Sequence, residues 1–244
     1  MIKMKFLLAL CCSLMLVASA ADAQTKRPKA LPLKTQITNA EAAYKAGNYA
    51  EAQTLYTALI KKQKRNALFY KERGNAHLNQ SNFDAAIADY NMALKVKKNY
   101  VKAVFNRGLA YYAKGENAKA LTDYDRAATL LDAPSKVKPA DLRKRGLTPK
   151  DLGEPMAAEK IFYARGIARY KQADYQVAAQ DFSEAIARKA DYSEAYDGRA
   201  SARFGLKQYK ESASDFEKVK QLTPASTRPE PYLKWMRETA AVQN

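Results

Sequence analysis

Cysteine and histidine are scarce in this 244-residue chain, which contains two Cys and one His. Zinc fingers, thiol redox motifs and multi-histidine metal sites need several such side chains at fixed spacing, so this composition argues against all three. Glycine and proline are also few, at nine residues each, which excludes collagen-like and low-complexity chains. Hydrophobic residues make up 47% of the chain, enough for one domain or a short repeat array with a sizeable core.

Acidic residues are too few to balance the basic ones. The chain has 42 Lys and Arg against 25 Asp and Glu, which gives a formal net charge of +17. A charge of this size attracts anionic partners, among them acidic proteins, nucleic acids and anionic envelope material. The pattern of the rest of the sequence has to decide between these classes.

One short apolar run stands near the start of the chain. Residues 1–23 are typical of a secretory signal peptide, because Lys3 and Lys5 precede the apolar run Phe6–Val17 and small residues follow it. The run is too short for a helix that crosses a bilayer core of about 30 Å, so a membrane anchor is the weaker interpretation. Both Cys residues lie in this run, so the mature chain would have none. Cleavage hardly changes the net charge, so the basic excess belongs to the mature protein.

The sequence repeats with a period of 34 residues. Arg73-Gly74 recurs as Arg107-Gly108, and Arg165-Gly166 recurs as Arg199-Ala200. Sixteen residues after each Arg stands an Asp followed by an aromatic residue: Asp89-Tyr90, Asp123-Tyr124, Asp181-Phe182 and Asp215-Phe216. A weaker first copy contains Ala40, Gly47, Tyr49, Ala52 and Tyr56. The five copies begin at residues 33, 67, 101, 159 and 193.

Each copy has the pattern of two amphipathic helices joined by a short turn. The expected turns contain small residues, namely Gly47, Ser81, Gly115 and Ala173. Three further glycines fall inside the first helices: Gly74, Gly108 and Gly166. A glycine within a helix costs about 1 kcal/mol relative to Ala, so we expect a second helix to approach closely at these three positions.

These residues resemble the tetratricopeptide repeat (TPR), a family with this 34-residue period and a pattern of small and aromatic positions. The resemblance implies an all-α, superhelical solenoid of helix-turn-helix units, here five repeats arranged three plus two. The expected organisation is a signal peptide (1–23), a basic lead-in (24–32), repeats one to three (33–134), a basic insertion (135–158), repeats four and five (159–226) and a C-terminal capping helix (227–244).

The recurrent Arg and Asp are interpreted as structural ion pairs rather than as a catalytic or anion site. They stand on opposite helices of one repeat, beside the close-packed Gly and the core aromatic, so a pair would hold the geometry within or between repeats. The expected pairs are Arg73 with Asp89, Arg107 with Asp123, Arg165 with Asp181 and Arg199 with Asp215.

The resemblance implies that the first helix of each repeat lines a concave groove. The residues expected to bind a partner there are Tyr44, Lys71, Asn75, Lys102, Phe105, Asn106, Tyr112, Lys160, Tyr163 and Tyr170. A groove of Lys, Asn and Tyr suits an extended acidic peptide or a carboxylate. Several of the Tyr could instead fill gaps between repeats.

A sharper alternative from the resemblance is a clamp for a partner's C-terminal carboxylates. Lys71, Asn75, Asn106 and Lys160 stand at matching positions, but Ala164 replaces the last basic residue and the insertion separates Lys160 from the others. The cytosolic partners of such clamps also suit a secreted chain poorly.

Basic residues gather at the expected connections between repeats. These are Lys61, Lys62, Lys64 and Arg65, then Lys95, Lys97, Lys98 and Lys102. They are either solvated helix ends, where Lys is mildly stabilising, or a surface for a polyanion. Nucleic acid is disfavoured as a partner for a secreted chain, which leaves anionic lipid or wall polymer.

The sequence shows no nucleophile–base arrangement, phosphate loop or metal-ligand spacing, so no enzyme activity, cofactor or metal is expected. His77 is interpreted as a hydrogen-bonded packing residue. The sequence therefore predicts a non-catalytic scaffold or adaptor in a bacterial periplasm or envelope, with an acidic protein as partner. The alternative is an envelope protein that binds a polyanion through its basic edge, and a regulatory subunit of an envelope enzyme is a third possibility.

Overall fold

The computed structural model describes residues 31–132 and 156–224, and ten α-helices account for the regular structure of these two segments. They form five helix–turn–helix pairs, as the all-α solenoid prediction requires. The first helices are α2 (Leu33–Lys45), α4 (Ala67–Asn79), α6 (Val101–Ala113), α9 (Ala158–Lys171) and α11 (Ser193–Gly205). The second helices are α3 (Tyr49–Lys62), α5 (Phe83–Val96), α7 (Asn117–Asp132), α10 (Tyr175–Arg188) and α12 (Tyr209–Leu222).

Each first helix begins within one residue of the start that the 34-residue period predicts. The expected signal peptide (1–23) and capping helix (227–244) lie outside the described residues, as do most of the basic lead-in (24–32) and most of the basic insertion (135–158).

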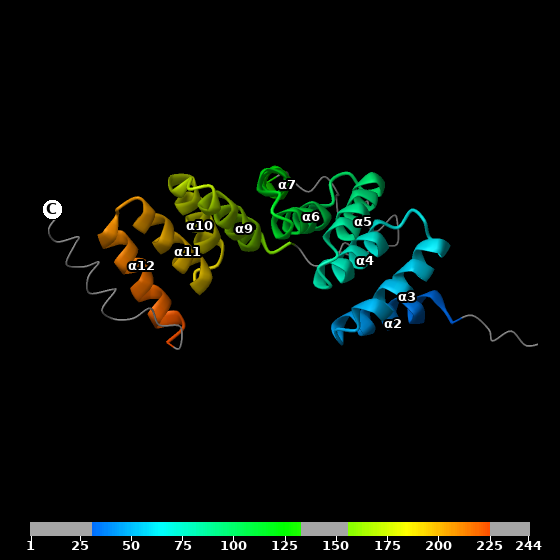
Figure 1. Cartoon of the computed structure of the whole chain (residues 1–244). Coiled ribbons are helices and arrows are strands. Elements are labelled where there is room, and N and C mark those ends of the chain that lie inside the picture. Colours follow the sequence, from blue (N-terminus) through cyan, green and yellow to red (C-terminus); the bar gives the residue numbers. More distant parts are fainter. Residues whose placement is uncertain (1–30, 133–155, 225–244) are drawn as a thin grey trace, which may run out of the picture.

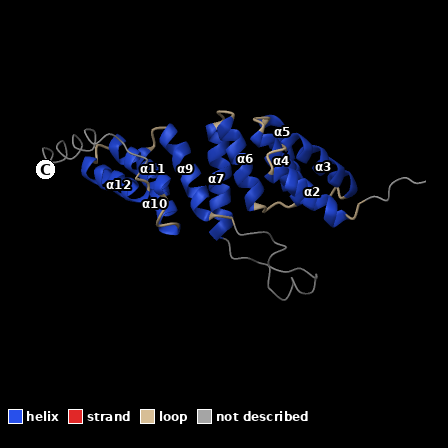
Figure 2. Ribbon diagram, turned by 90° about the horizontal axis from the view of Figure 1, so that it is seen from below, coloured by secondary structure: helices blue, strands red, loops and turns tan. Residues whose placement is uncertain are grey.

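The pairs follow one another in a curved row that forms an arch (Figure 1). In this view α5 and α7 lie on the upper, convex side, and α4 and α6 lie beneath them. Seen from below, the helices lie side by side along the length of the molecule (Figure 2). Every helix packs against the helices before and after it in the chain.

The turn within each pair contains one residue in the left-handed backbone region. The φ angles are +79° at Gly47, +59° at Ser81, +85° at Gly115, +59° at Ala173 and +63° at Lys207. The first four are the predicted turn residues. Glycine adopts this conformation freely, whereas each of the other side chains carries a local cost of order 1 kcal/mol.

The glycines inside the first helices are needed because an aromatic ring of the second helix lies against their backbone. A Cβ atom added to Gly108 would lie 2.7 Å from Cε1 of Tyr124, and one added to Gly74 would lie 2.8 Å from Cε1 of Tyr90. Gly166 meets Phe182 in the same way. The predicted close approach of the helices is confirmed, and it explains why glycine and aromatic recur together.

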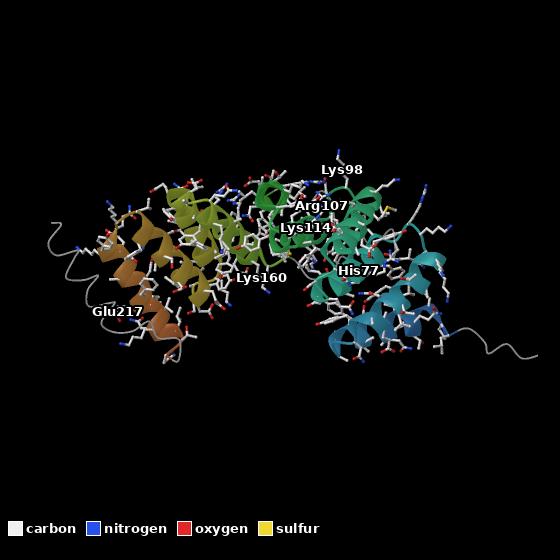
Figure 3. All side chains as sticks on the ribbon, viewed as in Figure 1. His77, Lys98, Arg107, Lys114, Lys160 and Glu217 are labelled. Atoms are coloured by element: carbon white, nitrogen blue, oxygen red, sulfur yellow. The ribbon has the colours of Figure 1, made fainter. Side chains whose placement is uncertain are left out.

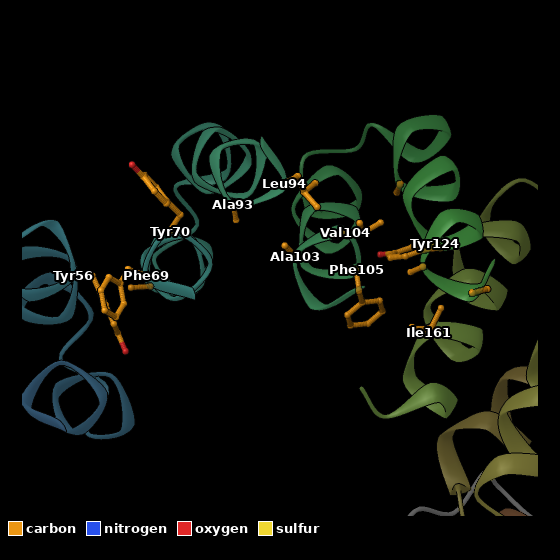
Figure 4. Packing of buried hydrophobic residues seen from close by; sticks show 14 of the residues in the cluster. Tyr56, Phe69, Tyr70, Ala93, Leu94, Ala103, Val104, Phe105, Tyr124 and Ile161 are labelled. Atoms are coloured by element: carbon orange, nitrogen blue, oxygen red, sulfur yellow. The ribbon is translucent and has the colours of Figure 1, made fainter. Parts of the chain in front are cut away.

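The core is continuous along the array. One cluster of buried residues extends from Ala40 in α2 to Ala195 in α11. Figure 4 shows its middle part, where Tyr56 and Phe69 meet between α3 and α4, and Ile161 of α9 lies near the α6–α7 pair. Helix α9 packs directly on α7, so the insertion between them does not interrupt the stacking of the repeats.

The recurrent Arg binds the Asp of its own repeat through two nitrogens. In Arg107, Nε donates to Oδ2 of Asp123 at 2.8 Å and Nη2 donates to Oδ1 at 2.6 Å. Arg73 and Asp89 have the same geometry. In the remaining two pairs, Arg165 with Asp181 and Arg199 with Asp215, Nη2 of the Arg also lies 2.6 Å from Oδ1 of the Asp. All four carboxylates are buried, at 2–5% exposure, so the guanidinium groups supply the charge compensation that burial demands.

The third nitrogen of each Arg reaches the preceding repeat. In repeats two and three, Nη1 of Arg73 donates to Thr57 at 3.0 Å and Nη1 of Arg107 donates to Asn91 at 2.6 Å. In repeats four and five, Nη1 of Arg165 donates to Asp125 at 3.0 Å and Nη1 of Arg199 donates to Ser183 at 3.1 Å. Three of these contacts span 16 residues, and the contact of Arg165 spans 40 because the insertion intervenes. One side chain therefore joins the two helices of a repeat and also joins that repeat to its neighbour.

The contact at Gly108 predicts that Gly108→Ala destabilises the protein. The gain in helix propensity is about 1 kcal/mol, but overpacking against a buried ring costs typically about 1–3 kcal/mol. We expect a net loss of about 1 kcal/mol in the free energy of unfolding, measured by urea denaturation. An unchanged or higher stability would show that the Tyr124 ring moves aside without strain.

The buried carboxylate of Asp123 predicts that Asp123→Asn lowers the free energy of unfolding by about 2 kcal/mol, since hydrogen bonds to charged groups contribute about 1.5–3 kcal/mol each. Asp84→Asn is the matched control, because Asp84 pairs with Lys114 while 83% of its side chain is exposed. Exposed ion pairs contribute little, so this control should unfold like the unmodified protein. Equal denaturation midpoints for the two variants would contradict a structural role for the buried pair.

Candidate functional site

The residues predicted to bind a partner differ in how far the structure exposes them. Lys160 is exposed at the start of α9 and extends toward the concave side of the arch (Figure 3). Tyr112 on α6 is half-buried, and so is Lys102 at the start of that helix. All three side chains keep some exposed surface on the first helices of their repeats.

Phe105 and Lys71 stand at the same place in their repeats, and both are buried, at 6% and 7% exposure. The Phe105 ring packs 5.8 Å from the Tyr124 ring, inside the core. Lys71 forms an ion pair with Glu72. Phe105 belongs to the continuous core cluster, where the second helix α7 supplies the ring that it packs against. Neither side chain presents much surface to a partner in this structure.

Asn75 and Asn106 bond to each other across α4 and α6. Oδ1 of Asn75 accepts hydrogen bonds from Nδ2 of Asn106 at 2.7 Å and from the Tyr90 hydroxyl at 2.8 Å, while its Nδ2 donates to Glu72 at 2.9 Å. Together with the Lys71–Glu72 pair, these bonds engage three of the four residues of the proposed carboxylate clamp. The groups that would grip a carboxylate are thus already used within the solenoid.

Three of the predicted tyrosines pack against other rings. The Tyr44 ring lies edge-on to Tyr49 at 5.4 Å, Tyr163 lies 5.1 Å from Tyr192, and Tyr170 lies 5.3 Å from Tyr175. Tyr44 also accepts a hydrogen bond from Asn79. Burial raises the pKa of the Tyr44 and Tyr163 phenols, which keeps both neutral. These side chains fill gaps between helices, which is the alternative that the sequence left open.

A cleft of about 1190 Å³, called here the basic cleft, opens at one edge of the first three repeats. It lies where the α3–α4 and α5–α6 connections come together, beside the starts of α4 and α6. Its basic residues are Lys61, Lys62, Lys64, Arg65, Lys71, Lys97 and Lys102, and its acidic residues are Glu41 and Glu72. Lys98, also predicted for this edge, instead extends from the convex side (Figure 3).

Several cations of the basic cleft are not neutralised. Lys61, Lys64 and Arg65 are exposed, and none of them lies within 4.0 Å of a carboxylate in the part of the chain that the structure describes. Lys62 donates to the Gln36 side chain at 2.5 Å, and the ammonium of Lys97 lies 4.8 Å from the Tyr100 ring centroid. Both of these partners are uncharged, so the cleft presents a concentrated positive charge to solvent.

His77 packs on α4 without the hydrogen bond expected for it. Its Nδ1 is buried and has no partner among the described residues, and its Nε2 lies 3.8 Å from Oδ2 of Asp89, beyond hydrogen-bond distance. In repeats four and five the same place is taken by Arg169 and Arg203, which bind the corresponding Asp at 2.9 Å and 2.6 Å. Burial lowers the pKa of His77 and outweighs the nearby Asp89 carboxylate, which raises it, while Arg73 lowers it further.

Residues 31–132 and 156–224 contain no group of three or more His, Cys, Asp or Glu side chains that could hold a metal ion. Among the same residues there is no helix with the length and apolar character that membrane crossing requires.

Five stacked helix pairs, each with one turn residue in the left-handed backbone region, define an α-helical repeat solenoid. A family model of the tetratricopeptide repeat matches residues 37–100, 72–135 and 163–227, which together exceed half of the chain. The chain therefore belongs to the tetratricopeptide repeat family.

Sequence relatives share the repeats over part of their length. The chain is 33% identical over 121 residues to serine/threonine-protein phosphatase 5 of Homo sapiens, covering 50% of this chain and 22% of that protein. It is 34% identical over 105 residues to small glutamine-rich tetratricopeptide repeat-containing protein 2 of Saccharomyces cerevisiae, covering 43% of this chain and 29% of the relative. The chain thus spans under a third of these relatives.

Solved structures share the fold at low sequence identity. PilW, described as a widely conserved type IV pilus biogenesis factor, superposes with a TM-score of 0.66 at 15% identity, covering 86% of each chain. MamA from Desulfovibrio magneticus RS-1 gives a TM-score of 0.62 at 14% identity, covering 80% of this chain and 97% of MamA. At these identities the likeness establishes the architecture alone.

The environment of His77 predicts an acid-sensitive stability. The unfolded chain binds a proton at His77 near the ordinary pKa of 6.5, whereas the folded chain binds it only at lower pH, so the unfolding free energy decreases as pH falls below about 6.5. His77→Tyr, which copies Tyr111 of the next repeat, should remove this dependence. Urea unfolding at pH 7.5 and 5.5 measures this pH dependence. An equal loss of unfolding free energy in the unmodified protein and in His77→Tyr would contradict the prediction.

Proposed function

We propose that the chain is a non-catalytic interaction scaffold that binds an extended, acidic segment of a partner protein. The observation that carries this proposal is the basic cleft, in which seven cations face two carboxylates. Complementary charge steers association and sets the register of a bound segment. A solenoid whose helices are held by buried ion pairs offers this surface without reorganisation, which lowers the cost of binding.

The positive surface continues from the basic cleft onto the concave side. Lys102 lines the cleft and stands on the first-helix face of α6. Lys160, at the equivalent place on α9, extends toward the concave side of the arch (Figure 3). A segment that enters at the cleft can follow the first helices with its carboxylates near these ammonium groups. Tyr112 adds a half-buried aromatic surface on α6.

The proposed location is a bacterial periplasm or envelope, and it is supported by the signal-type residues 1–23. A location of this kind favours acidic protein over nucleic acid as the partner.

A second candidate function is the binding of an anionic lipid surface or wall polymer. The unpaired cations Lys61, Lys64 and Arg65 favour it, since a polyanion can bind exposed charges without using the concave face. The two functions differ in their salt dependence. Polyanion binding releases many counterions and falls steeply with salt, whereas a peptide that also makes short-range contacts tolerates moderate salt.

The test compares two double variants that remove the same charge. Lys64→Gln with Arg65→Gln alters the basic cleft, and Lys95→Gln with Lys98→Gln alters exposed cations that do not line it. A fluorescent heptapeptide rich in Glu serves as the probe. We expect the cleft variant to bind it about tenfold more weakly, which corresponds to about 1.4 kcal/mol, and the control variant to change affinity less than about twofold.

Equal weakening in both double variants would show that the field of the whole chain, rather than the cleft, attracts the peptide. Polyphosphate and phosphatidylglycerol vesicles are titrated in parallel at low and moderate salt. Stronger binding of either polyanion than of the peptide, with a steep loss at moderate salt, would support the second function and overturn the first.

A further inference from the structure

We infer that the basic cleft recognises a peptide segment in which an acidic residue lies beside a bulky aliphatic residue. This inference rests on the proposed function and specifies the partner of the same site. It comes from the apolar side chains of the cleft, which charge alone does not explain.

Large aliphatic side chains are exposed within the basic cleft. Leu68 and Val96 both line it, at 39% and 37% exposure, and the half-buried ring of Tyr100 lines it as well. Single exposed hydrophobic residues scattered over a surface need no explanation, but these three share one cleft with seven cations. An apolar centre with charged residues around it is the usual composition of a protein-binding surface.

The repeat itself does not require an apolar residue at the position of Leu68. Leu68 is the second residue of its 34-residue copy. The second residues of the other four copies are Lys34, Lys102, Lys160 and Glu194. A charged side chain is therefore compatible with the stacking of the helices, and the exposed leucine contributes little to the solenoid's own core. Its presence is explained by contact with something outside the chain.

The backbone that presents Leu68 is held in place. The Asn66 side chain accepts a hydrogen bond from the backbone N–H of Leu68 at 3.1 Å and caps the start of α4. The same side chain donates to Gln63 at 3.0 Å, and the Tyr70 hydroxyl donates to the carbonyl of Lys64 at 3.2 Å. The α3–α4 connection is thus fixed from both sides and the cleft is preformed. Binding of a segment therefore costs little free energy for ordering this connection.

The combination of charge and aliphatic surface favours a peptide over a polymer of uniform charge. A phosphate or sugar polymer has no aliphatic side chain for Leu68 and Val96 to contact, so it would leave their exposed surface in water. A peptide can place a carboxylate near Lys64 or Arg65 and a neighbouring aliphatic group near Leu68. Burial of that group adds affinity in proportion to the apolar area removed from water.

The experiment uses two labelled peptides of equal charge and the purified full chain. One has the sequence Gly-Glu-Glu-Leu-Glu-Glu-Gly and the other has Ser in place of Leu. We expect the unmodified protein to bind the leucine peptide about tenfold more tightly, because burying a leucine side chain is worth this factor or more. Leu68→Gln should reduce the preference to less than about twofold, while affinity for the serine peptide stays the same.

Met92→Gln is the matched control. Met92 is 40% exposed on α5 but does not line the cleft, and Gln retains high helix propensity at both positions. This variant should keep the tenfold preference. Circular dichroism melting of both variants confirms that they fold.

Equal affinity of the unmodified protein for both peptides would overturn the inference and leave the proposed function intact. Retention of the preference in Leu68→Gln would overturn it as well, since another surface would then contact the leucine. Failure of both peptides to bind would overturn the proposed function and the inference together. Binding of phosphatidylglycerol vesicles that is lost in Leu68→Gln, without peptide preference, would assign the cleft to lipid.

Discussion

One guanidinium group in each of repeats two to five joins three helices, and the rest of the solenoid depends on it. Arg107 binds buried Asp123 through two nitrogens and Asn91 of the preceding repeat through the third. Its five N–H donors in a rigid plane suit this task, which a lysine could not perform. Arg165 likewise joins Asp181 of its own repeat to Asp125 of α7 across the insertion, so the array continues from α7 to α9 as one stack.

Close packing of the array leaves function to its surface. The rings of Tyr90 and Tyr124 fill the space that the glycine backbones of the first helices leave open, and Phe105 is buried in the core against Tyr124. The amides of Asn75 and Asn106 bond to each other between α4 and α6. What remains accessible is the edge where the repeats are connected. There the cations that end one helix and begin the next gather around exposed aliphatic side chains.

The sequence predicted the fold well and the site in part. The starts of the five repeats, four of the turn residues and the Arg–Asp partners all follow from the 34-residue period, because each depends on spacing within one or two repeats. The burial of Phe105 could not be predicted, because helical periodicity defines a face of one helix and packing against other helices decides whether that face is open. Leu68 and Val96 were missed, although Leu68 breaks a series of charged residues at its position.

The sequence by itself determined the helix pairs, the ion-pair partners and the excess of positive charge, since these depend on residue type and short-range spacing. The tertiary structure decided where that charge is usable. Lys71 is buried beside Glu72, Lys98 extends from the convex side, and Lys61, Lys64 and Arg65 come together in one cleft. The curvature of the stack and the meeting of the α3–α4 and α5–α6 connections produce this division, and both arise only when the repeats pack against one another.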